Sequence, residues 1–459
     1  MRIKRPFKKR GLFGSGFFLV AALIIATPLV LAGVAGYYLF LKDAVKPRID
    51  LEPQAEATSL KRPFTITASD DQSGIRSLAI TVTQGQRRFQ VFSKVYDPPR
   101  DSVSERFTLS GSELRGGNFE MQAAASDGSY ANLGAGNTAR ITRTMRLDST
   151  LPVVKALSPA QYMRQGGAGL VIYEVSKDVA RSGVQVGDLF FPGYKQPGGK
   201  YACLFGFPFD IDASNYKPRI LAEDTAGNAK LGFFVNMAIK RAFREERVEI
   251  SDAYLAAHLP AFAALFPDVR DPVERFRKLM TDLRRQNDAT LAELATHTSP
   301  KALWDGNFLY LPRSVVKGSF AADRVYLYNG QEILRERHGG IDLASVPNAP
   351  VPAANNGLVV LAGPLGVYGL AVVIDHGMGL QSLYGHLSSI AVKVGDTVKK
   401  GDTIGATGTT GFALGNDVHF ATLLAGQPVI PIEWWDGHWL EDNVTQKFKR
   451  FAGDDTAGQ

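Results

Sequence analysis

The sequence predicts a mainly β protein that is built from several modules. Three observations lead to this fold class. Short apolar strands divided by glycines fill residues 338–420, β-prone runs alternate with turn clusters over residues 47–238, and helical spacing of apolar residues is confined to about residues 239–300. At 459 residues the chain is too long for one hydrophobic core. Its 45% hydrophobic and 21% charged residues are typical of globular domains rather than disordered chains.

The first ten residues form a basic head. The formal net charge is +7, and six cations of the head leave 7 − 6 = +1 for residues 11–459. A nucleic-acid-binding protein needs clustered cations on its folded part, so we expect no nucleic-acid partner. The six cations of this head are Arg2, Lys4, Arg5, Lys8, Lys9 and Arg10.

Residues 11–41 form a run of 31 residues without a charged side chain. As a helix this run would reach roughly 46 Å, which exceeds a hydrocarbon core of about 30 Å. We therefore expect a single-pass transmembrane anchor at 11–41, with residues 1–10 in the cytoplasm and the bulk of the chain in the periplasm or cell envelope. The alternative is a cleaved signal peptide with a site near Gly33-Val-Ala35, but the apolar run continues to Leu41 and favours an uncleaved anchor.

Two similar β-modules are expected between residues 47 and 238. The turn Ser69-Asp-Asp-Gln-Ser-Gly-Ile75 is echoed by Ser176-Lys-Asp-Val-Ala-Arg-Ser-Gly-Val184, about 100 residues later. This spacing is the size of an immunoglobulin-like sandwich. We predict Ig-like β-sandwich modules at 47–150 and 151–238, joined at Leu151-Pro152.

Two chemical alternatives in these modules are less favoured. The aspartates of the turns could bind calcium, but no loop has the ligand spacing of an EF-hand, and Asp-Gly and Ser-Gly pairs are ordinary turn residues. Cys203 is the single cysteine and cannot form an intramolecular disulfide. Because it lies far from the histidine-rich segment, we expect a buried structural residue and not a thiol nucleophile.

A helical connector is expected at residues 239–305. Asp271-Pro-Val-Glu274 supplies an N-cap, a proline at the first helical position and an acid three residues after the cap. An apolar stripe at helical spacing follows, and we expect it to pack against the C-terminal domain or another chain. The stripe consists of Phe276, Leu279, Met280 and Leu283.

Histidine is concentrated near the C-terminus. Residues 338–420 hold four of the seven histidines, in the motifs His338-Gly-Gly-Ile-Asp342, Tyr384-Gly-His386 and Asp417-Val-His419-Phe420, with His376 between them. Imidazole and carboxylate are zinc ligands, and three of them leave a fourth position for a water that zinc acidifies. A His-x-x-x-Asp pair alone is more often a surface or structural pair than a metal site. Its position among short strands instead predicts zinc on His338, Asp342 and His419, with His386 free to move protons.

The segment Val392-Lys-Val-Gly-Asp-Thr-Val-Lys-Lys-Gly-Asp-Thr-Ile-Gly405 also has the rhythm of a biotinyl or lipoyl carrier hairpin. A carrier needs a lysine at an exposed hairpin tip. The corresponding stretch, Asp375 to Tyr384, contains no lysine. The carrier function is therefore not expected.

Residues 313–439 resemble the lysostaphin/LytM-type zinc peptidases (family M23), which cut peptide bonds in bacterial cell walls. The resemblance lies in HGGIDLA, PVPAANNG, VVIDHGMGLQSLYGHL, VKVGDTVKKGDTIGATGTTG and GQPVIPIEWW, in this order along the chain. It implies an antiparallel β-sandwich peptidase domain of the duplicated hybrid motif fold at 306–442, followed by a tail at 443–459. It also implies zinc on His338, Asp342 and His419, and a catalytic role for His386.

One position departs from the pattern of this family, which ends in His-x-His. Here Asp417 occupies the place that resembles the second catalytic histidine. An ionised aspartate cannot donate a hydrogen bond to an oxyanion, but it could accept a proton from water or orient His386. We therefore expect an envelope-facing zinc metalloendopeptidase that cleaves peptide cross-links of peptidoglycan, with His386 and Asp417 as catalytic residues. The alternative is a catalytically impaired LytM-like domain that binds cell wall or regulates another wall hydrolase.

Overall fold

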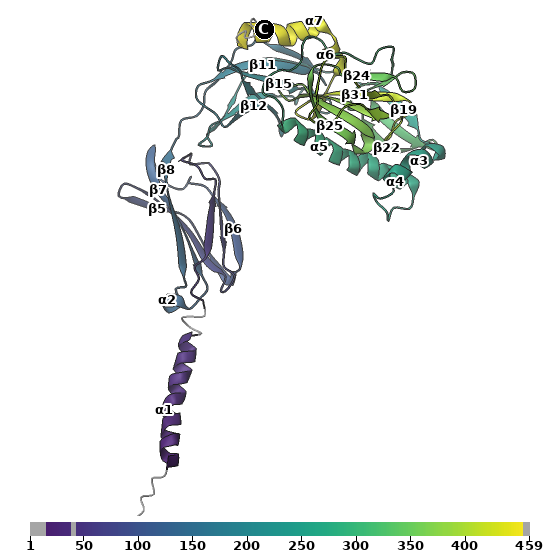
Figure 1. Cartoon of the computed structure of the whole chain (residues 1–459). Coiled ribbons are helices and arrows are strands. Elements are labelled where there is room, and N and C mark those ends of the chain that lie inside the picture. The colour runs from purple at the N-terminus through teal and green to yellow at the C-terminus, as the bar shows by residue number, and fades with distance from the viewer. Residues whose placement is uncertain (1–14, 38–42, 453–459) are drawn as a thin grey trace, which may run out of the picture. The chain divides into compact units, whose positions relative to one another are not determined.

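A computed structural model describes residues 15–37 and 43–452, and these form two compact units (Figure 1). Unit 1 is Met1–Thr150 with Thr225–Asn228, and unit 2 is Leu151–Asp224 with Ala229–Gln459. Most regular structure is strand, as predicted. The domain boundaries inside unit 2 remain predictions.

The first helix, α1, spans Ser15–Gly36 and contains Pro28. In the part of the chain that the structure describes, no helix is long and apolar enough to cross a membrane. The transmembrane anchor predicted at 11–41 is therefore not supported. Its ends, residues 11–14 and 38–41, and the basic head at 1–10 lie outside the described residues.

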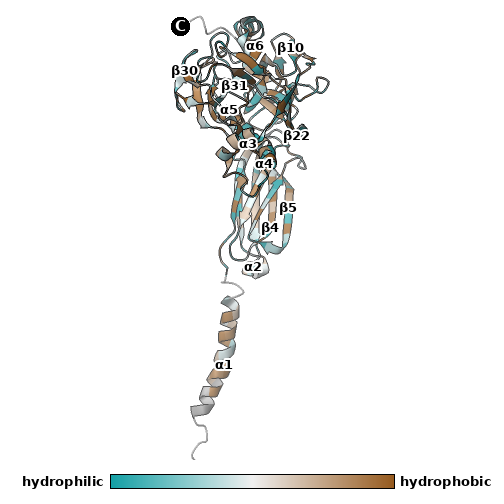
Figure 2. Cartoon of the chain, turned by 90° about the vertical axis from the view of Figure 1, so that its right-hand side faces the viewer, coloured by the Kyte–Doolittle hydropathy of each residue, from teal (hydrophilic) through white to brown (hydrophobic). Residues whose placement is uncertain are grey.

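Unit 1 is a β-sandwich of a three-stranded sheet, β1-β3-β6, and a five-stranded sheet, β2-β8-β7-β4-β5. Buried side chains occupy alternate positions along β7. Hydrophobic and hydrophilic residues are interspersed along β4 and β5 of this unit (Figure 2). Buried residues of both sheets form one core, but the Ig-like character of the module stays a prediction. The elements are β1 Arg48–Glu52, β2 Ala57–Thr58, β3 Phe64–Ser69, β4 Ile75–Gln84, β5 Arg87–Arg100, β6 Ser102–Phe107, β7 Gly117–Asp127, α2 Ala131–Gly134 and β8 Thr138–Leu147.

Three buried aspartates meet at one end of this sandwich. Carboxylate oxygens of Asp43, Asp70 and Asp127 lie within 4.8 Å of one another. One oxygen of Asp70 accepts hydrogen bonds from the backbone N–H groups of the turn at residues 72–74. This bonding is the turn chemistry expected of an aspartate.

The N-terminal part of unit 2 has two four-stranded sheets, β14-β15-β11-β9 and β13-β12-β16-β17, and a parallel pair, β10-β18. Cys203 is fully buried in β15, as predicted. These sheets share one hydrophobic core with the C-terminal part of unit 2. The strands are β9 Val154–Ala156, β10 Gln161–Arg164, β11 Ala168–Val175, β12 Arg181–Val186, β13 Leu189–Pro192, β14 Tyr194–Lys195, β15 Tyr201–Gly206, β16 Arg219–Glu223, β17 Ala229–Gly232 and β18 Asn236–Ile239.

The C-terminal part of unit 2 is organised on a large antiparallel sheet with the order β20-β23-β31-β27-β26-β25-β29, and β32 also pairs with β31. A second sheet has the order β24-β30-β28. These strands are β20 Val315–Gly318, β23 Ile341–Ala344, β24 Pro350–Pro352, β25 Gly357–Pro364, β26 Leu370–Asp375, β27 Leu380–Leu387, β28 Ser389–Ile390, β29 Thr397–Val398, β30 Thr403–Ala406, β31 Asp417–Leu424 and β32 Gln427–Val429; a 3-10 turn, η4, spans Gly366–Tyr368.

The helices of the predicted connector pack on one face of the large sheet, but residues 245–249 of the predicted span form strand β19 instead. Asp271 caps α4 by accepting a hydrogen bond from the Glu274 N–H, and the apolar stripe that begins at Phe276 is buried against β26, β27 and β31. The elements of this region are β19 Glu245–Glu249, α3 Asp252–His258, η2 Leu259–Phe262, α4 Pro272–Lys278, η3 Leu279–Leu283, α5 Arg284–Thr296, β21 Asp323–Tyr328 and β22 Gln331–Arg337.

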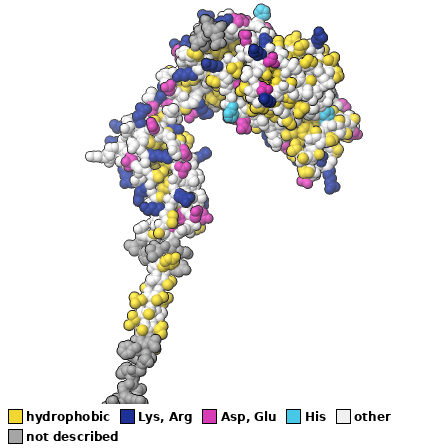
Figure 3. Space-filling model, in the orientation of Figure 1, with side chains coloured by type: hydrophobic (Ala, Val, Ile, Leu, Met, Phe, Trp, Pro, Cys, Tyr) yellow, Lys and Arg dark blue, Asp and Glu magenta, His cyan; other side chains and the backbone are white. Residues whose placement is uncertain are grey.

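The chain closes with short helical segments. These are α6 Pro431–Trp435, α7 Gly437–Leu440, η5 Glu441–Thr445 and η6 Phe448–Ala452. On the face of unit 2 seen in Figure 3, basic and acidic side chains are interspersed. Residues 453–459 of the predicted tail lie outside the described residues.

Candidate metal centre

Two neighbouring strands and one glycine turn bring the predicted zinc ligands together. Asp342 on β23 lies directly opposite His419 on the antiparallel strand β31. His338 precedes β23 and is separated from it by Gly339 and Gly340. A Cβ atom on Gly340 would lie 2.6 Å from His419 Nε2, so this turn can pass the imidazole only with glycine at that position.

The three donor atoms form a nearly equilateral triangle. His338 Nε2 lies 3.1 Å from Asp342 Oδ1 and 3.1 Å from His419 Nδ1, and His419 Nδ1 lies 2.9 Å from Asp342 Oδ1. Donors bound to tetrahedral zinc at ordinary bond lengths lie roughly 3.3 Å apart. The triangle is close to this size, and a His₂Asp set leaves a fourth position open. The residues therefore fit a catalytic zinc ion.

A backbone contact fixes the orientation of His338. Its Nδ1–H donates to the carbonyl of Ser319 at 2.9 Å. With the proton on Nδ1, the lone pair of Nε2 points to Asp342 and His419. Such second contacts of a ligating histidine set its tautomer and its ring orientation.

A buried arginine holds the other oxygen of the carboxylate. Arg324 on β21 donates to Asp342 Oδ2 at 2.5 Å and to Glu246 Oε2 at 3.1 Å. Arg324 is only 6% exposed, and Glu246 stands opposite it in the parallel pair β19-β21. The bonds of Arg324 leave Asp342 Oδ1 facing the two histidines. The sequence motifs did not predict either residue.

His386 stands beside the triangle with its ring centroid 5.9 Å from that of His419. Its backbone has a positive φ of 63°, in the left-handed region. The Nδ1–H of His386 donates to the carbonyl of Thr410 at 2.9 Å, and burial lowers its pKa to about 4. Nε2 is therefore unprotonated at neutral pH and can accept a proton.

Asp417 lies on β31 on the same face as His419, because alternate residues of a strand share a face. Its Oδ1 is buried without a hydrogen-bond partner. Burial, followed by the negative charge of Asp342, raises the pKa of Asp417 to about 8. Without a bound cation this shift favours the protonated carboxyl, which can donate a hydrogen bond. Asp417 and His386 are not hydrogen-bonded to each other in the described part of the chain.

The other histidine of this segment has a structural role. The ring of His376 is fully buried, with Nδ1 2.7 Å from the Asn356 carbonyl and Nε2 2.7 Å from the Ser382 hydroxyl. It lies outside the cluster formed by the three predicted ligands.

The connector covers the region next to this centre. His258 at the end of α3 donates from Nδ1 to the Gly411 carbonyl at 2.6 Å, and the ring of Phe262 stacks on Phe412 with centroids 4.9 Å apart. Gly411 and Phe412 directly follow Thr410, the partner of His386. All five predicted site residues are at most 8% exposed. Sequence periodicity predicted that this segment packs, but it could not show which part of the sheet it covers.

Comparisons with known proteins assign this part of the chain to a family. Residues 336–431 match the profile of Peptidase family M23. The resemblance to lysostaphin/LytM-type peptidases is thus confirmed for the C-terminal domain.

Three curated relatives align with this region. DD-carboxypeptidase/endopeptidase Mpg of Neisseria meningitidis serogroup B is 40% identical over 95 residues, which are 21% of this chain and 22% of the relative. Peptidoglycan DD-endopeptidase ShyA of Vibrio cholerae is 38% identical over 92 residues, 20% of this chain and 21% of the relative. Murein hydrolase activator EnvC of Escherichia coli is 36% identical over 106 residues, 23% of this chain and 25% of the relative. The alignments therefore span about a quarter or less of each relative. A solved structure of a putative peptidase M23 from Pseudomonas aeruginosa aligns at 18% identity and a TM-score of 0.38, covering 60% of this chain and 94% of that chain.

Proposed function

We propose that this chain is a zinc-dependent endopeptidase that cleaves peptide cross-links of peptidoglycan. The observation that carries the proposal is the buried triangle of donor atoms from His338, Asp342 and His419. Its size and its His₂Asp composition suit zinc with one open position. The names of Mpg and ShyA support the substrate class, because both relatives are endopeptidases and ShyA acts on peptidoglycan.

In this mechanism His338, Asp342 and His419 hold the metal, and the remaining residues handle protons and charge. A bound zinc ion polarises a carbonyl group and acidifies water. His386 Nε2 accepts the proton of the attacking water, because burial keeps the ring neutral and the bond to Thr410 holds its single proton on Nδ1. Protonated Asp417 donates to the substrate oxygen on which negative charge develops. A bound cation lowers the pKa of a nearby carboxyl, so this donor role requires Asp417 to keep its proton while the metal is bound. The variants Asp417→Asn and Asp417→Ala test this requirement.

We also propose that the catalytic part acts on the outer side of the cytoplasmic membrane, where peptidoglycan lies. The motivating feature is the basic run at 1–10 before an uncharged stretch at 11–41, an order of charges that export signals also have. A reporter enzyme fused after residue 459 should be active only outside the cytoplasm. Activity of the reporter inside the cytoplasm would exclude this location.

A second candidate function is regulation of another wall hydrolase. The relative EnvC is named as a murein hydrolase activator, and Asp417 departs from the His-x-His pattern. The two functions differ in one observable. A peptidase opens cross-links by itself, whereas a regulator changes wall digestion only when a second hydrolase is present.

The experiment is release of dye from covalently labelled cell wall by the purified chain. We expect release by the wild type, loss after chelation, and recovery on addition of zinc. The Asp342→Ala variant should release no dye under any of these conditions. Equal release with and without chelator would refute zinc dependence, and release only in the presence of an added amidase would favour the regulatory function.

A further inference from the structure

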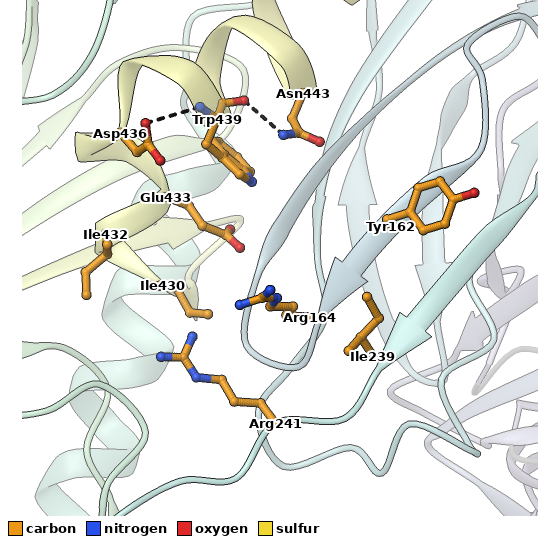
Figure 4. Close-up of a pocket in the computed structure, with 10 residues that line it drawn as sticks. All are labelled: Tyr162, Arg164, Ile239, Arg241, Ile430, Ile432, Glu433, Asp436, Trp439 and Asn443. Atoms are coloured by element: carbon orange, nitrogen blue, oxygen red, sulfur yellow. Dashed lines mark hydrogen bonds between the residues drawn. The ribbon is translucent and has the colours of Figure 1, made fainter.

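Unit 2 has a hollow of about 520 Å³ apart from the metal ligands. It lies where strands β10 and β18 meet the segment that leads from β32 through α6 and α7. Figure 4 shows Arg164, Arg241 and Glu433 directed toward the centre of this hollow, with Trp439 above them. Small-molecule and peptide sites commonly have volumes of this order.

In the hollow, the carboxylates have hydrogen-bond partners within the protein and the guanidinium groups do not. Glu433 accepts a hydrogen bond from the Ala168 N–H at 2.7 Å, and Asp436 accepts from the N–H of His438 at 2.9 Å as the cap of α7. Burial also raises the pKa of Glu433 to about 7, so its carboxyl is partly protonated at neutral pH. By contrast, the guanidinium groups of Arg164 and Arg241 have no hydrogen bond or ion pair with any side chain or carbonyl in the described ranges. Arg241 lies over the Phe243 ring at 6.0 Å, and both arginines act on Glu433 only through their charge. The hollow thus offers two guanidinium groups with free N–H donors to an anionic group.

The rim of the hollow is apolar. Tyr162 is 70% exposed, Ile432 is 51% exposed and Ile239 is 44% exposed. Exposed apolar residues around convergent polar groups are typical of ligand sites. Guanidinium groups bind carboxylates through two parallel hydrogen bonds, and the rim can cover short aliphatic side chains. Together these features suit a peptide that carries free carboxylates.

A short chain of contacts connects the hollow with the metal centre. Ile430 in the wall of the hollow donates its N–H to the Gly166 carbonyl at 2.8 Å. Gly166 lies against Phe320, because a Cβ atom at this glycine would be 2.8 Å from the Phe320 ring. The residue before Phe320 is Ser319, whose carbonyl orients His338. The two sites therefore border the same backbone segment.

We propose that this hollow is an anchoring subsite that binds a carboxylate-bearing peptide of the wall polymer through Arg164 and Arg241. The proposal rests on the proposed function for the identity of the polymer, but not for the binding chemistry. Arg164 and Arg241 contact the carboxylates, Trp439 and Tyr162 cover the aliphatic part, and neither arginine takes part in the metal centre.

The test is calorimetric binding of a soluble disaccharide-tetrapeptide without a cross-link to the full-length chain. The double variant Arg164→Gln/Arg241→Gln should bind at least about tenfold more weakly than the wild type, because two charge-assisted hydrogen-bonding groups are removed. Arg270→Gln, a substitution of an exposed arginine outside the hollow, should bind like the wild type. The same peptide with amidated carboxylates should lose a similar factor against the wild type. Thermal unfolding of each variant checks that the fold is intact.

Equal binding by the wild type and the double variant would overturn the proposal, as would undiminished binding of the amidated peptide. Binding of vesicles with anionic lipid, without binding of the peptide, would also overturn it. The Asp342→Ala variant separates this proposal from the proposed function, because it should still bind the peptide. Arginine-dependent binding by a wild type that cleaves no wall would leave the subsite standing and remove the peptidase.

Discussion

Arg324 donates a hydrogen bond of 2.5 Å to Oδ2 of Asp342, the carboxylate oxygen that does not face the two histidines. Glu246 accepts a second bond from the same guanidinium at 3.1 Å and offsets its positive charge. The pairing of β19 with β21 places Glu246 opposite Arg324. A cation bound at Asp342 Oδ1 would therefore meet an ionised, oriented carboxylate beside a neutralised arginine.

The first prediction concerns this pair. Arg324→Met keeps an unbranched apolar stem but removes both hydrogen bonds, so Asp342 loses its fixed orientation. We expect zinc affinity to fall by about 10- to 100-fold, the range typical of residues that orient metal ligands. Competition with a chromophoric chelator measures this affinity. Arg335→Met, which alters a half-exposed arginine of the neighbouring strand, should not change it. Unchanged affinity in Arg324→Met would mean that Arg324 has no role at the metal.

The second prediction concerns the ligands themselves. Removal of one of three donors leaves too few to hold zinc tightly. His419→Ala and Asp342→Ala should be purified without zinc, whereas His386→Ala should retain one ion per chain. Elemental analysis measures the ratio of metal to protein. A wild type without stoichiometric metal, or a His386→Ala variant that lacks it, would show that the ligand assignment is wrong.

The third prediction concerns the protonation state of Asp417. If the protonated carboxyl donates to the substrate oxygen, an amide can replace it, because Asn also donates. Asp417→Asn should then keep turnover within about tenfold of the wild type. Asp417→Ala should lose about 10²–10³-fold, the usual cost of one oxyanion donor. Steady-state cleavage of a labelled cross-linked peptide provides the rates.

Two other results at this position would have different meanings. If Asp417→Asn is as inactive as Asp417→Ala, the carboxylate acts as a base and the donor role is incorrect. If the wild type is inactive and Asp417→His cleaves cross-links, the natural protein is a binding or regulatory domain with an almost complete active site.

The fourth prediction concerns stability and pH. Lys447 is 6% exposed, and its Nζ donates to Gln161 Oε1 at 2.6 Å. Burial lowers the pKa of Lys447 from 10.5 to about 8. Between pH 8 and 10.5 the folded chain releases a proton that the unfolded chain keeps, so this lysine makes the free energy of unfolding rise with pH.

The substitution Lys447→Met removes this titration. The free energy of unfolding of the variant minus that of the wild type should therefore be about 1–2 kcal/mol larger at pH 7 than at pH 9.5. Urea unfolding at the two pH values measures it. Lys449→Met is the control, since the side chain of Lys449 is 52% exposed. A wild-type-to-variant difference that is the same at both pH values would contradict the pKa of Lys447.

The predictability of this structure differs between its parts. The ligands at 338, 342 and 419 could be predicted because the chemistry of His and Asp occurs in ordered motifs, and the register of two adjacent strands brings these motifs together. Arg324 and Glu246 could not, because they meet through a parallel strand pair that joins segments 78 residues apart. On a strand, either residue alone is an ordinary charged side chain.

The raised pKa of Asp417 also could not be predicted from the sequence. Its pKa depends on burial and on the nearby charge of Asp342, and both follow from the packing of the sheet. The connector was predicted as helical from its cap at Asp271, but the contact between His258 and Gly411 depends on tertiary structure. Residues of the hollow at 164, 241 and 433 come from three separate segments without any common motif.

The most direct measurement of the central claim is mass spectrometry of muropeptides after isolated cell wall is incubated with the purified full-length chain and zinc. We predict that cross-linked dimers decrease, that monomers increase in proportion, and that the glycan strands stay intact. The same incubation with Asp342→Ala should leave the dimers unchanged. Undiminished dimers with the zinc-loaded wild type, or equal loss of dimers with Asp342→Ala, would contradict the account.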